Sequence, residues 1–200
     1  MLQGAAGQIE ALRDLPEGSS KGIAIICHPH PLFGGTMDNK VVQTLARAFV
    51  QTGWTALRFN FRGIGQSMGV YDEGRGEADD LRALINQELP TGSALALAGF
   101  SFGSFVVSQV LGEAAQSHDL QKIVMVGTAA SRFAVASIPV KLHEKLLVVH
   151  GEHDDTVSLA SVMDWARPQV IPVTVVPGGG HFFHGQLPLL RGLVVRHLLS

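Results

Sequence analysis

A serine between two glycines is the residue of this sequence best suited to act as a nucleophile. Ser101 lies in residues 99–103 (GFSFG), which match G-x-S-x-G between an apolar run and a segment with helical spacing. The motif requires this strand–turn–helix context, because the tight turn has no room for side chains at Gly99 and Gly103. The helix that follows points its N-terminus at the serine, so the Phe102 N–H can stabilise an oxyanion. An ordinary helix-capping serine in a glycine-rich turn is the alternative interpretation.

Aspartates downstream of Ser101 are candidates for the acid of a catalytic triad. A serine hydroxyl is a poor nucleophile at neutral pH, so it needs a base beside it and a third group that orients this base. After a nucleophile turn of this kind, the acid and then the histidine follow along the sequence. Asp154 lies in the loop after the apolar run that ends at His150, and it is the predicted acid. Asp155 is its competitor, and either aspartate is alternatively a cap of the helix that begins near Val157.

His181 is the predicted general base. It ends the loop 177–181 (PGGGH), which follows the last predicted strand. An imidazole with an ordinary pKa of about 6.5 accepts and returns a proton at neutral pH, as the two half-reactions of acyl transfer require. His184, close by in the sequence, is the alternative base.

Alternating strands and helices must position these residues. Short aliphatic or β-branched runs, each closed by Gly, Pro or His, predict strands, and the segments with helical spacing between them predict helices. The predicted strands are 7–12, 22–27, 54–61, 94–98, 122–126, 146–150 and 173–176, and the predicted helices are 39–51, 77–89, 102–113, 157–166 and 187–199. Strands joined through helices are parallel. We therefore predict an α/β fold with a mostly parallel central sheet, helices on both faces and a ligand site beyond the carboxyl ends of the strands.

Further segments give the sequence a family resemblance. Residues 28–42 (HPHPLFGGTMDNKVV) and 60–67 (NFRGIGQS), together with the Ser101 turn and the two later segments, resemble the small, lidless bacterial α/β-hydrolases related to dienelactone-hydrolase-like esterases. The resemblance covers nearly the whole chain. It implies the α/β-hydrolase fold, with Ser101 as nucleophile, Asp154 as acid and His181 as base. Dienelactone hydrolases carry a cysteine where this chain has Ser101, so their specific reaction is not transferred.

The resemblance also implies that the loop beginning at residue 28 supplies a second oxyanion donor beside the Phe102 N–H. Pro29 and Pro31 have no N–H group and cannot donate. His30 or Leu32 must therefore supply the donor. His30 is preferred, because it lies two residues past the first histidine of this loop.

The site is predicted to be open. A cap domain does not fit in the segment 127–144, which is where many lipases insert one. Aromatic side chains near the site are candidates for the lining of an apolar acyl or alcohol pocket, with core packing as the alternative for each. They are Phe33, Phe100, Phe102, Phe133, Phe182 and Phe183.

Composition narrows the class of protein and its partners. The 200 residues fit one α/β-hydrolase domain, predicted over 1–200, and 46% hydrophobic against 16% charged residues predict a large buried core. A net charge of −2 without any Lys/Arg cluster argues against a nucleic-acid partner. The apolar runs are too short to span a bilayer, Cys27 is the single cysteine, and the N-terminus lacks the pattern of a secretory signal. We therefore expect a soluble, cytoplasmic protein with a small-molecule acyl substrate.

The sequence predicts a serine hydrolase, and more narrowly a carboxylesterase that cleaves small or medium acyl esters or thioesters through an acyl-enzyme. No cofactor or metal is expected. One alternative is a non-catalytic binding protein that retains the fold, since a fold does not determine a function. The other is a metal-dependent hydrolase, because His28-x-His30 and His150-x-x-His153-Asp154 offer nitrogen and oxygen ligands at strand ends.

Overall fold

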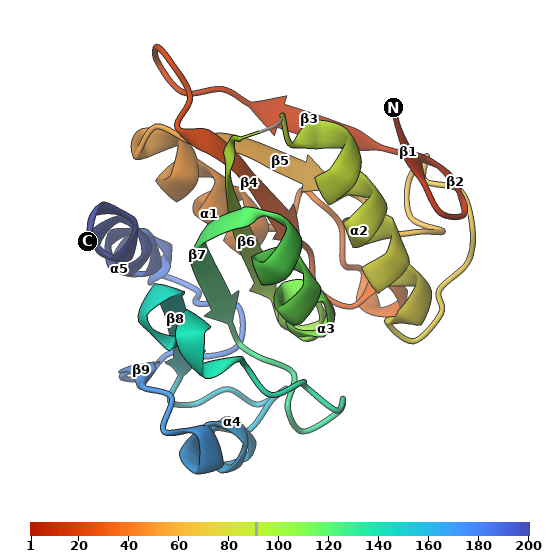
Figure 1. Cartoon of the computed structure of the whole chain (residues 1–200). Helices are drawn as coiled ribbons and strands as arrows, with labels where there is room; N and C mark the ends of the chain where they lie inside the picture. The colour runs from red at the N-terminus through yellow and green to blue at the C-terminus, as the bar shows by residue number, and fades with distance from the viewer. Residues whose placement is uncertain (91) are drawn as a thin grey trace.

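A seven-stranded sheet forms the centre of the computed structural model, which describes residues 1–90 and 92–200 (Figure 1). Its strands run in the order β3-β5-β4-β6-β7-β8-β9, and every neighbouring pair is parallel except β3 and β5. The strands are β3 (Ala11–Asp14), β4 (Gly22–Cys27), β5 (Thr55–Phe59), β6 (Ala94–Phe100), β7 (Asp119–Val126), β8 (Leu146–Gly151) and β9 (Val173–Val176). An antiparallel hairpin of β1 (Leu2–Gly4) and β2 (Gly7–Ile9) precedes the sheet. The predicted, mostly parallel sheet is confirmed.

Helices cover both faces of this sheet. One face packs against α1 (Lys40–Gln51) and α5 (Leu187–Leu199), and the other packs against α2 (Arg75–Glu88), α3 (Phe102–Ser117) and α4 (Leu159–Ala166) (Figure 1). Three short 3-10 turns complete the elements, namely η1 (Pro31–Phe33), η2 (Val140–Lys145) and η3 (Arg167–Gln169). Within the residues described, no helix has the length and apolarity needed to cross a membrane.

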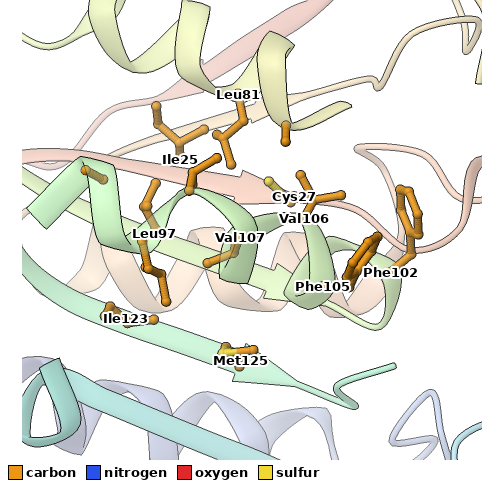
Figure 2. Packing of buried hydrophobic residues seen from close by; sticks show 14 of the residues in the cluster. Ile25, Cys27, Leu81, Leu97, Phe102, Phe105, Val106, Val107, Ile123 and Met125 are labelled. Carbon is orange, nitrogen blue, oxygen red and sulfur yellow. The ribbon is translucent and has the colours of Figure 1, made fainter. Parts of the chain in front are cut away.

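The central strands are apolar on both faces because both faces are covered. Along β4, Ile25 and Cys27 face the α2 and α3 side, whereas Ala24 and Ile26 belong to the core under α1 and α5. Figure 2 shows Ile25 and Cys27 within the first of these cores, close to side chains of α2 and α3. A parallel strand buried in this way is a continuous hydrophobic run rather than an alternating one.

The strand order places the ends of β4 and β6 at a topological switch point. From β4 the chain continues to β5 on one side and returns to β6 on the other. In open α/β sheets, ligands bind outside the carboxyl ends of the strands at such a point. The loops after Cys27 and Phe100 therefore meet at one edge of the sheet, and these are the loops that carry His30 and Ser101.

One predicted strand is wrong. Residues 7–12 form two strands, β2 and β3, rather than a single edge strand. The break falls at Glu10, whose carbonyl accepts from the Asn60 N–H and whose N–H donates to the Ser67 hydroxyl. These partners lie in the loop after β5, so the backbone of Glu10 leaves the ladder.

Two predicted boundaries shift for similar reasons. β5 ends at Phe59 instead of continuing to Phe61, because the N–H groups of Asn60 and Phe61 donate to the Glu10 carbonyl and to His28. The helix predicted from residue 157 begins at Leu159, since the Val157 N–H donates to the Asp154 carboxylate. The segment between β7 and η2 contains no cap domain, as predicted.

Gly103 allows helix α3 to lie directly on strand β4. A Cβ at this position would fall 2.2 Å from the Cys27 carbonyl oxygen and 2.7 Å from the His28 carbonyl oxygen. Both contacts are with backbone atoms, which cannot rotate away. Gly112, in the same helix, has no atom within 4 Å of the corresponding point.

We expect Gly103→Ala to lower the free energy of unfolding by about 1–3 kcal/mol, because α3 must shift away from β4. Gly112→Ala is the matched control, and it should raise the free energy of unfolding by about 0.4–1 kcal/mol through better helix propensity. Urea unfolding followed by circular dichroism measures both changes. A Gly103→Ala protein as stable as the wild type would show that the close approach of α3 to β4 is unimportant.

Candidate active site

Ser101 occupies a strained backbone position between β6 and α3. Its φ of 55° and ψ of −116° lie outside the regions that L-residues normally adopt. The turn is tight, since a Cβ on Gly99 would fall 2.4 Å from the Gly103 carbonyl carbon. The Ser101 N–H donates to the Val126 carbonyl at 2.8 Å, and the buried Ser104 hydroxyl donates to the Gly99 carbonyl at 2.7 Å. These bonds hold the strained turn against the end of β7.

The backbone N–H groups of Phe102 and His30 are available as oxyanion donors. In residues 1–90 and 92–200 neither N–H has a protein acceptor, and both residues line one pocket with Ser101. The Leu32 N–H, by contrast, donates to His30 Nδ1 at 3.2 Å, and the Leu32 side chain is 65% exposed. The geometry therefore favours His30 over Leu32.

Buried His28 ties the loop after β4 to the segment that follows β5. Its Nε2 accepts from the Phe61 N–H at 2.9 Å, so the proton is on Nδ1, which lies 2.6 Å from the Pro29 carbonyl oxygen. The ring also packs on Phe61, with centroids 4.5 Å apart. Burial lowers the pKa of His28 to about 4, although the hydrogen bond to Pro29 opposes the shift. His28 is thus a neutral structural ring.

Hydrogen bonds at both ring nitrogens fix the side chain of His30, and the sequence did not predict its distant partner. Because its Nδ1 accepts from Leu32, its Nε2 carries the proton and donates to the Tyr71 hydroxyl at 3.2 Å. Its ring lies among those of Phe33, Phe102 and Tyr71. Tyr71 lies in the long connection before α2, and no local pattern links it to a loop some forty residues earlier.

Asp154 and His181 form a buried hydrogen-bonded pair. The distance from His181 Nδ1 to Asp154 Oδ2 is 2.7 Å. Burial alone would raise the pKa of Asp154, but the hydrogen bonds from His181 and from the Val157 N–H outweigh it and hold the pKa below its ordinary value. The carboxylate is therefore ionised, and it leaves His181 Nε2 free to accept a proton.

The second oxygen of Asp154 caps the turn before α4. Asp154 Oδ1 accepts from the N–H groups of Thr156 and Val157 at 3.0 and 2.7 Å. The capping interpretation and the acid interpretation thus apply to the same side chain, one through each oxygen. Asp155 and His184, the alternatives, are both exposed, and the Asp155 carboxylate accepts a hydrogen bond from the hydroxyl of its neighbour Thr156.

His150 lies beside the Asp154 carboxylate in the interior of the protein. It is fully buried, its Nε2 lies 2.9 Å from the Val157 carbonyl oxygen, and the same nitrogen lies 3.4 Å from Asp154 Oδ2. His153 points elsewhere, with its side chain 73% exposed. Over the described ranges, no group of three or more His, Cys, Asp or Glu side chains is arranged to hold a metal ion.

One pocket of about 280 Å³ lies beside the Ser101 turn. Ser101 and His181 both line it, without a hydrogen bond between the serine hydroxyl and the imidazole among the described residues. Such bonds are often long or absent before substrate binds. Four of the candidate aromatics line the pocket, namely Phe33, Phe102, Phe133 and Phe182. The other two, Phe100 and Phe183, are fully buried in the core under α1 and α5, so for them the alternative interpretation of core packing holds.

Comparisons with known proteins identify a family and several relatives of this chain. The serine aminopeptidase, S33 family matches residues 18–148. XC6422 from Xanthomonas campestris, an α/β serine hydrolase without a lid, is 38% identical with a TM-score of 0.86, over 99% of this chain and 91% of that one. An α/β serine hydrolase homologue from Coxiella burnetii is also 38% identical, with a TM-score of 0.82 over 98% of this chain and 95% of its own. Uncharacterized protein RP471 from Rickettsia prowazekii (strain Madrid E) is 30% identical over 91% of this chain and 80% of its own.

The low pKa of His28 makes stability depend on pH. Between about 6.5, the ordinary value, and about 4, the folded value, the unfolded chain binds a proton that the folded chain does not. The free energy of unfolding therefore falls as the pH drops through this interval, by about 3 kcal/mol from this residue.

Urea unfolding at a series of pH values measures this slope. His28→Gln should lower stability at neutral pH and flatten the slope, whereas His153→Gln, at an exposed position, should leave it unchanged. If the variant does not fold, an NMR titration of wild-type His28 replaces it. A ring that protonates near its ordinary pKa would contradict the prediction.

Proposed function

The chain belongs to the serine aminopeptidase S33 family and to the small lidless α/β-hydrolases, and from this premise we propose that it is a serine carboxylesterase acting on small acyl esters or thioesters. The predicted α/β-hydrolase fold and family resemblance are confirmed, and the chain is a hydrolase. The proposal concerns the finer points, which are the triad of Ser101, Asp154 and His181, the oxyanion donors and the ester substrate.

The observation that carries the proposal is the buried pair of Asp154 and His181 beside a strained serine. His181 Nδ1 lies 2.7 Å from Asp154 Oδ2, and His181 lines the same pocket as Ser101. An ionised acid that fixes the tautomer of an imidazole near a serine on a positive-φ turn is the arrangement that nucleophilic acyl transfer requires. A binding protein has no need for this combination of strain and buried charge.

The proposed reaction has two half-reactions. His181 Nε2 accepts the Ser101 proton as Oγ attacks the ester carbonyl, and the N–H groups of Phe102 and His30 stabilise the oxyanion. His181 then protonates the leaving alcohol or thiol, which gives the acyl-enzyme. Water, activated by the same imidazole, hydrolyses it. Asp154 stays ionised throughout and stabilises the imidazolium.

The charge of the pocket supports an ester rather than a peptide with a free amino terminus. An aminopeptidase must bind an α-ammonium group, and a carboxylate is the usual partner for such a cation. No Asp or Glu lines the pocket in the part of the chain that the structure describes, and Arg132 does line it. The pocket volume of about 280 Å³ is at the lower end of ligand sites and suits a small acyl group.

Labelling with a fluorophosphonate tests the nucleophile. We expect the probe to modify Ser101, as shown by peptide mapping, and Ser101→Ala to abolish labelling. The same variant should lower kcat for p-nitrophenyl acetate by on the order of 10⁴-fold or more, and His181→Ala should do the same. The double variant should be little worse than either, because triad members act as a unit.

Two results would reject this assignment. One is near wild-type turnover by Ser101→Ala, and the other is loss of activity with a chelator while labelling persists, which would indicate a metal-dependent hydrolase. An aminoacyl p-nitroanilide provides the comparison for peptidase activity, and it should be cleaved far more slowly than the ester.

Asp154→Asn and Asp155→Asn separate the two candidate acids. The first removes the charge that fixes His181, so kcat for p-nitrophenyl acetate should fall by on the order of 10³- to 10⁴-fold. Asp155 is exposed, and its variant should retain activity within about twofold. Circular dichroism of both variants controls for folding. Equal losses in the two variants would show that Asp154 has no special role.

A further inference from the structure

Arg132 brings a positive charge into a pocket that four phenylalanines help to line. It lies in the segment after β7 and lines the pocket together with Ser101 and His181. Of the side chains that line this pocket in the described residues, Arg132 is the only lysine or arginine, and none is an aspartate or glutamate. The proposed triad acid, Asp154, is buried behind His181 and does not line the pocket.

Among the described residues, no carboxylate forms an ion pair with Arg132. The polar contact of its guanidinium within the described chain is the one from Nε to the Thr156 carbonyl oxygen, at 3.4 Å. The nearby Asp155 forms no ion pair with it and accepts instead from the Thr156 hydroxyl. Other arginines of this protein, such as Arg58 and Arg62, bind carboxylates at 2.7 Å. Arg132 thus has its Nη groups free for a ligand.

The charge of Arg132 reaches the proposed oxyanion loop. The pKa of His30 is lowered by burial first and by the positive charge of Arg132 second. His30 in turn packs against Phe102 and Phe133, whose rings form a wall of the pocket. A small substrate whose carbonyl meets Ser101 therefore has an apolar surface along its body and a cation within the same cavity.

We propose that Arg132 binds a free carboxylate on the substrate, so that the enzyme favours small esters carrying one carboxylate apart from the scissile bond. The planar guanidinium matches a carboxylate with two parallel hydrogen bonds. A single arginine neutralises a single carboxylate, whereas a dianionic phosphate would require more positive charge than this pocket offers. The inference rests on the proposed function, since it takes Ser101 as the nucleophile.

Paired substrates, each a free acid and its methyl ester, test the proposal. In the pair of mono-4-nitrophenyl adipate and methyl 4-nitrophenyl adipate, the acid carries its free carboxylate on the acyl side. In the pair of 4-acetoxybenzoate and its methyl ester, the acid carries it on the alcohol side. We expect kcat/KM of the wild type to favour the acid in at least one pair by about 10-fold. The preference should shrink with added salt, because the arginine is exposed to solvent.

Arg132→Gln should abolish this preference, so that kcat/KM falls about 10-fold more for the acid than for the neutral ester of the same pair. Arg132→Lys should keep part of it, since the charge remains but the paired hydrogen bonds do not. Arg191→Gln, which removes an exposed charge outside this pocket, is the control and should change nothing.

The possible outcomes separate the inference from the proposed function. Hydrolysis of the neutral esters and labelling of Ser101, without any preference for the acids, would overturn the role of Arg132 alone. An equal loss for acids and neutral esters in Arg132→Gln would also overturn it, by indicating a general effect on the oxyanion. Failure of the wild type to cleave any of the four esters or to react with the fluorophosphonate would overturn the proposed function itself.

Discussion

The turn between β6 and α3 is the constraint on which the rest of the site depends. A single residue, Ser101, separates the end of the strand from the start of the helix, so the chain reverses direction at a positive φ. This costs on the order of 1–3 kcal/mol of backbone strain, and the surrounding structure must hold it. The hydrogen bonds to Val126 and from Ser104 do so, through backbone carbonyls of β7 and β6. The strained turn is therefore tied to two neighbouring strands of the sheet.

The same turn determines where the proposed oxyanion donors lie. Gly103 brings the first turn of α3 onto the backbone of Cys27, so the Phe102 N–H and the loop that starts at His28 occupy the same edge of the sheet. His28 then fixes this loop from the other side through the Phe61 N–H. The packing of α3 on β4 positions the Phe102 N–H, and the hydrogen bond of neutral His28 positions the loop with the His30 N–H. Together they determine the distance between these two backbone donors.

Histidines around the site show how environment, rather than residue type, sets their roles. His28 is neutral because it is buried and accepts a backbone hydrogen bond, and His30 is held by Leu32 and Tyr71. His150 is buried behind the carboxylate, whereas His181 has both a buried acid on one nitrogen and the pocket beside its ring. Of these four histidines, His181 is the one that both pairs with a buried carboxylate and lines the pocket with Ser101, and this difference is a matter of tertiary contacts.

Local patterns predicted much of this molecule, and long-range contacts account for the rest. The Ser101 turn was predictable because its glycines and its strand–turn–helix context are local in the sequence. The break at Glu10 was not, since its partners in the loop after β5 lie some fifty residues away. The pocket aromatics were only partly predictable, because Phe100 and Phe102 flank the same serine but point into opposite cores. Two residues so spaced within one strand would face the same side, and the difference arises because Phe100 ends β6 whereas Phe102 already begins α3.

Without a cap domain, the loops at the strand ends must supply all substrate recognition. The segment after β7 contributes Phe133 and Arg132, and the loop after β4 contributes Phe33 and His30. An open pocket leaves water near any bound charge, so a single exposed arginine discriminates by a modest factor rather than by a large one. The apolar rings beside it raise that factor by excluding part of this water. Discrimination therefore depends on the combination of Arg132 with its aromatic neighbours, because the exposed charge alone gives a modest factor and the apolar surface alone does not favour an ester with a free carboxylate.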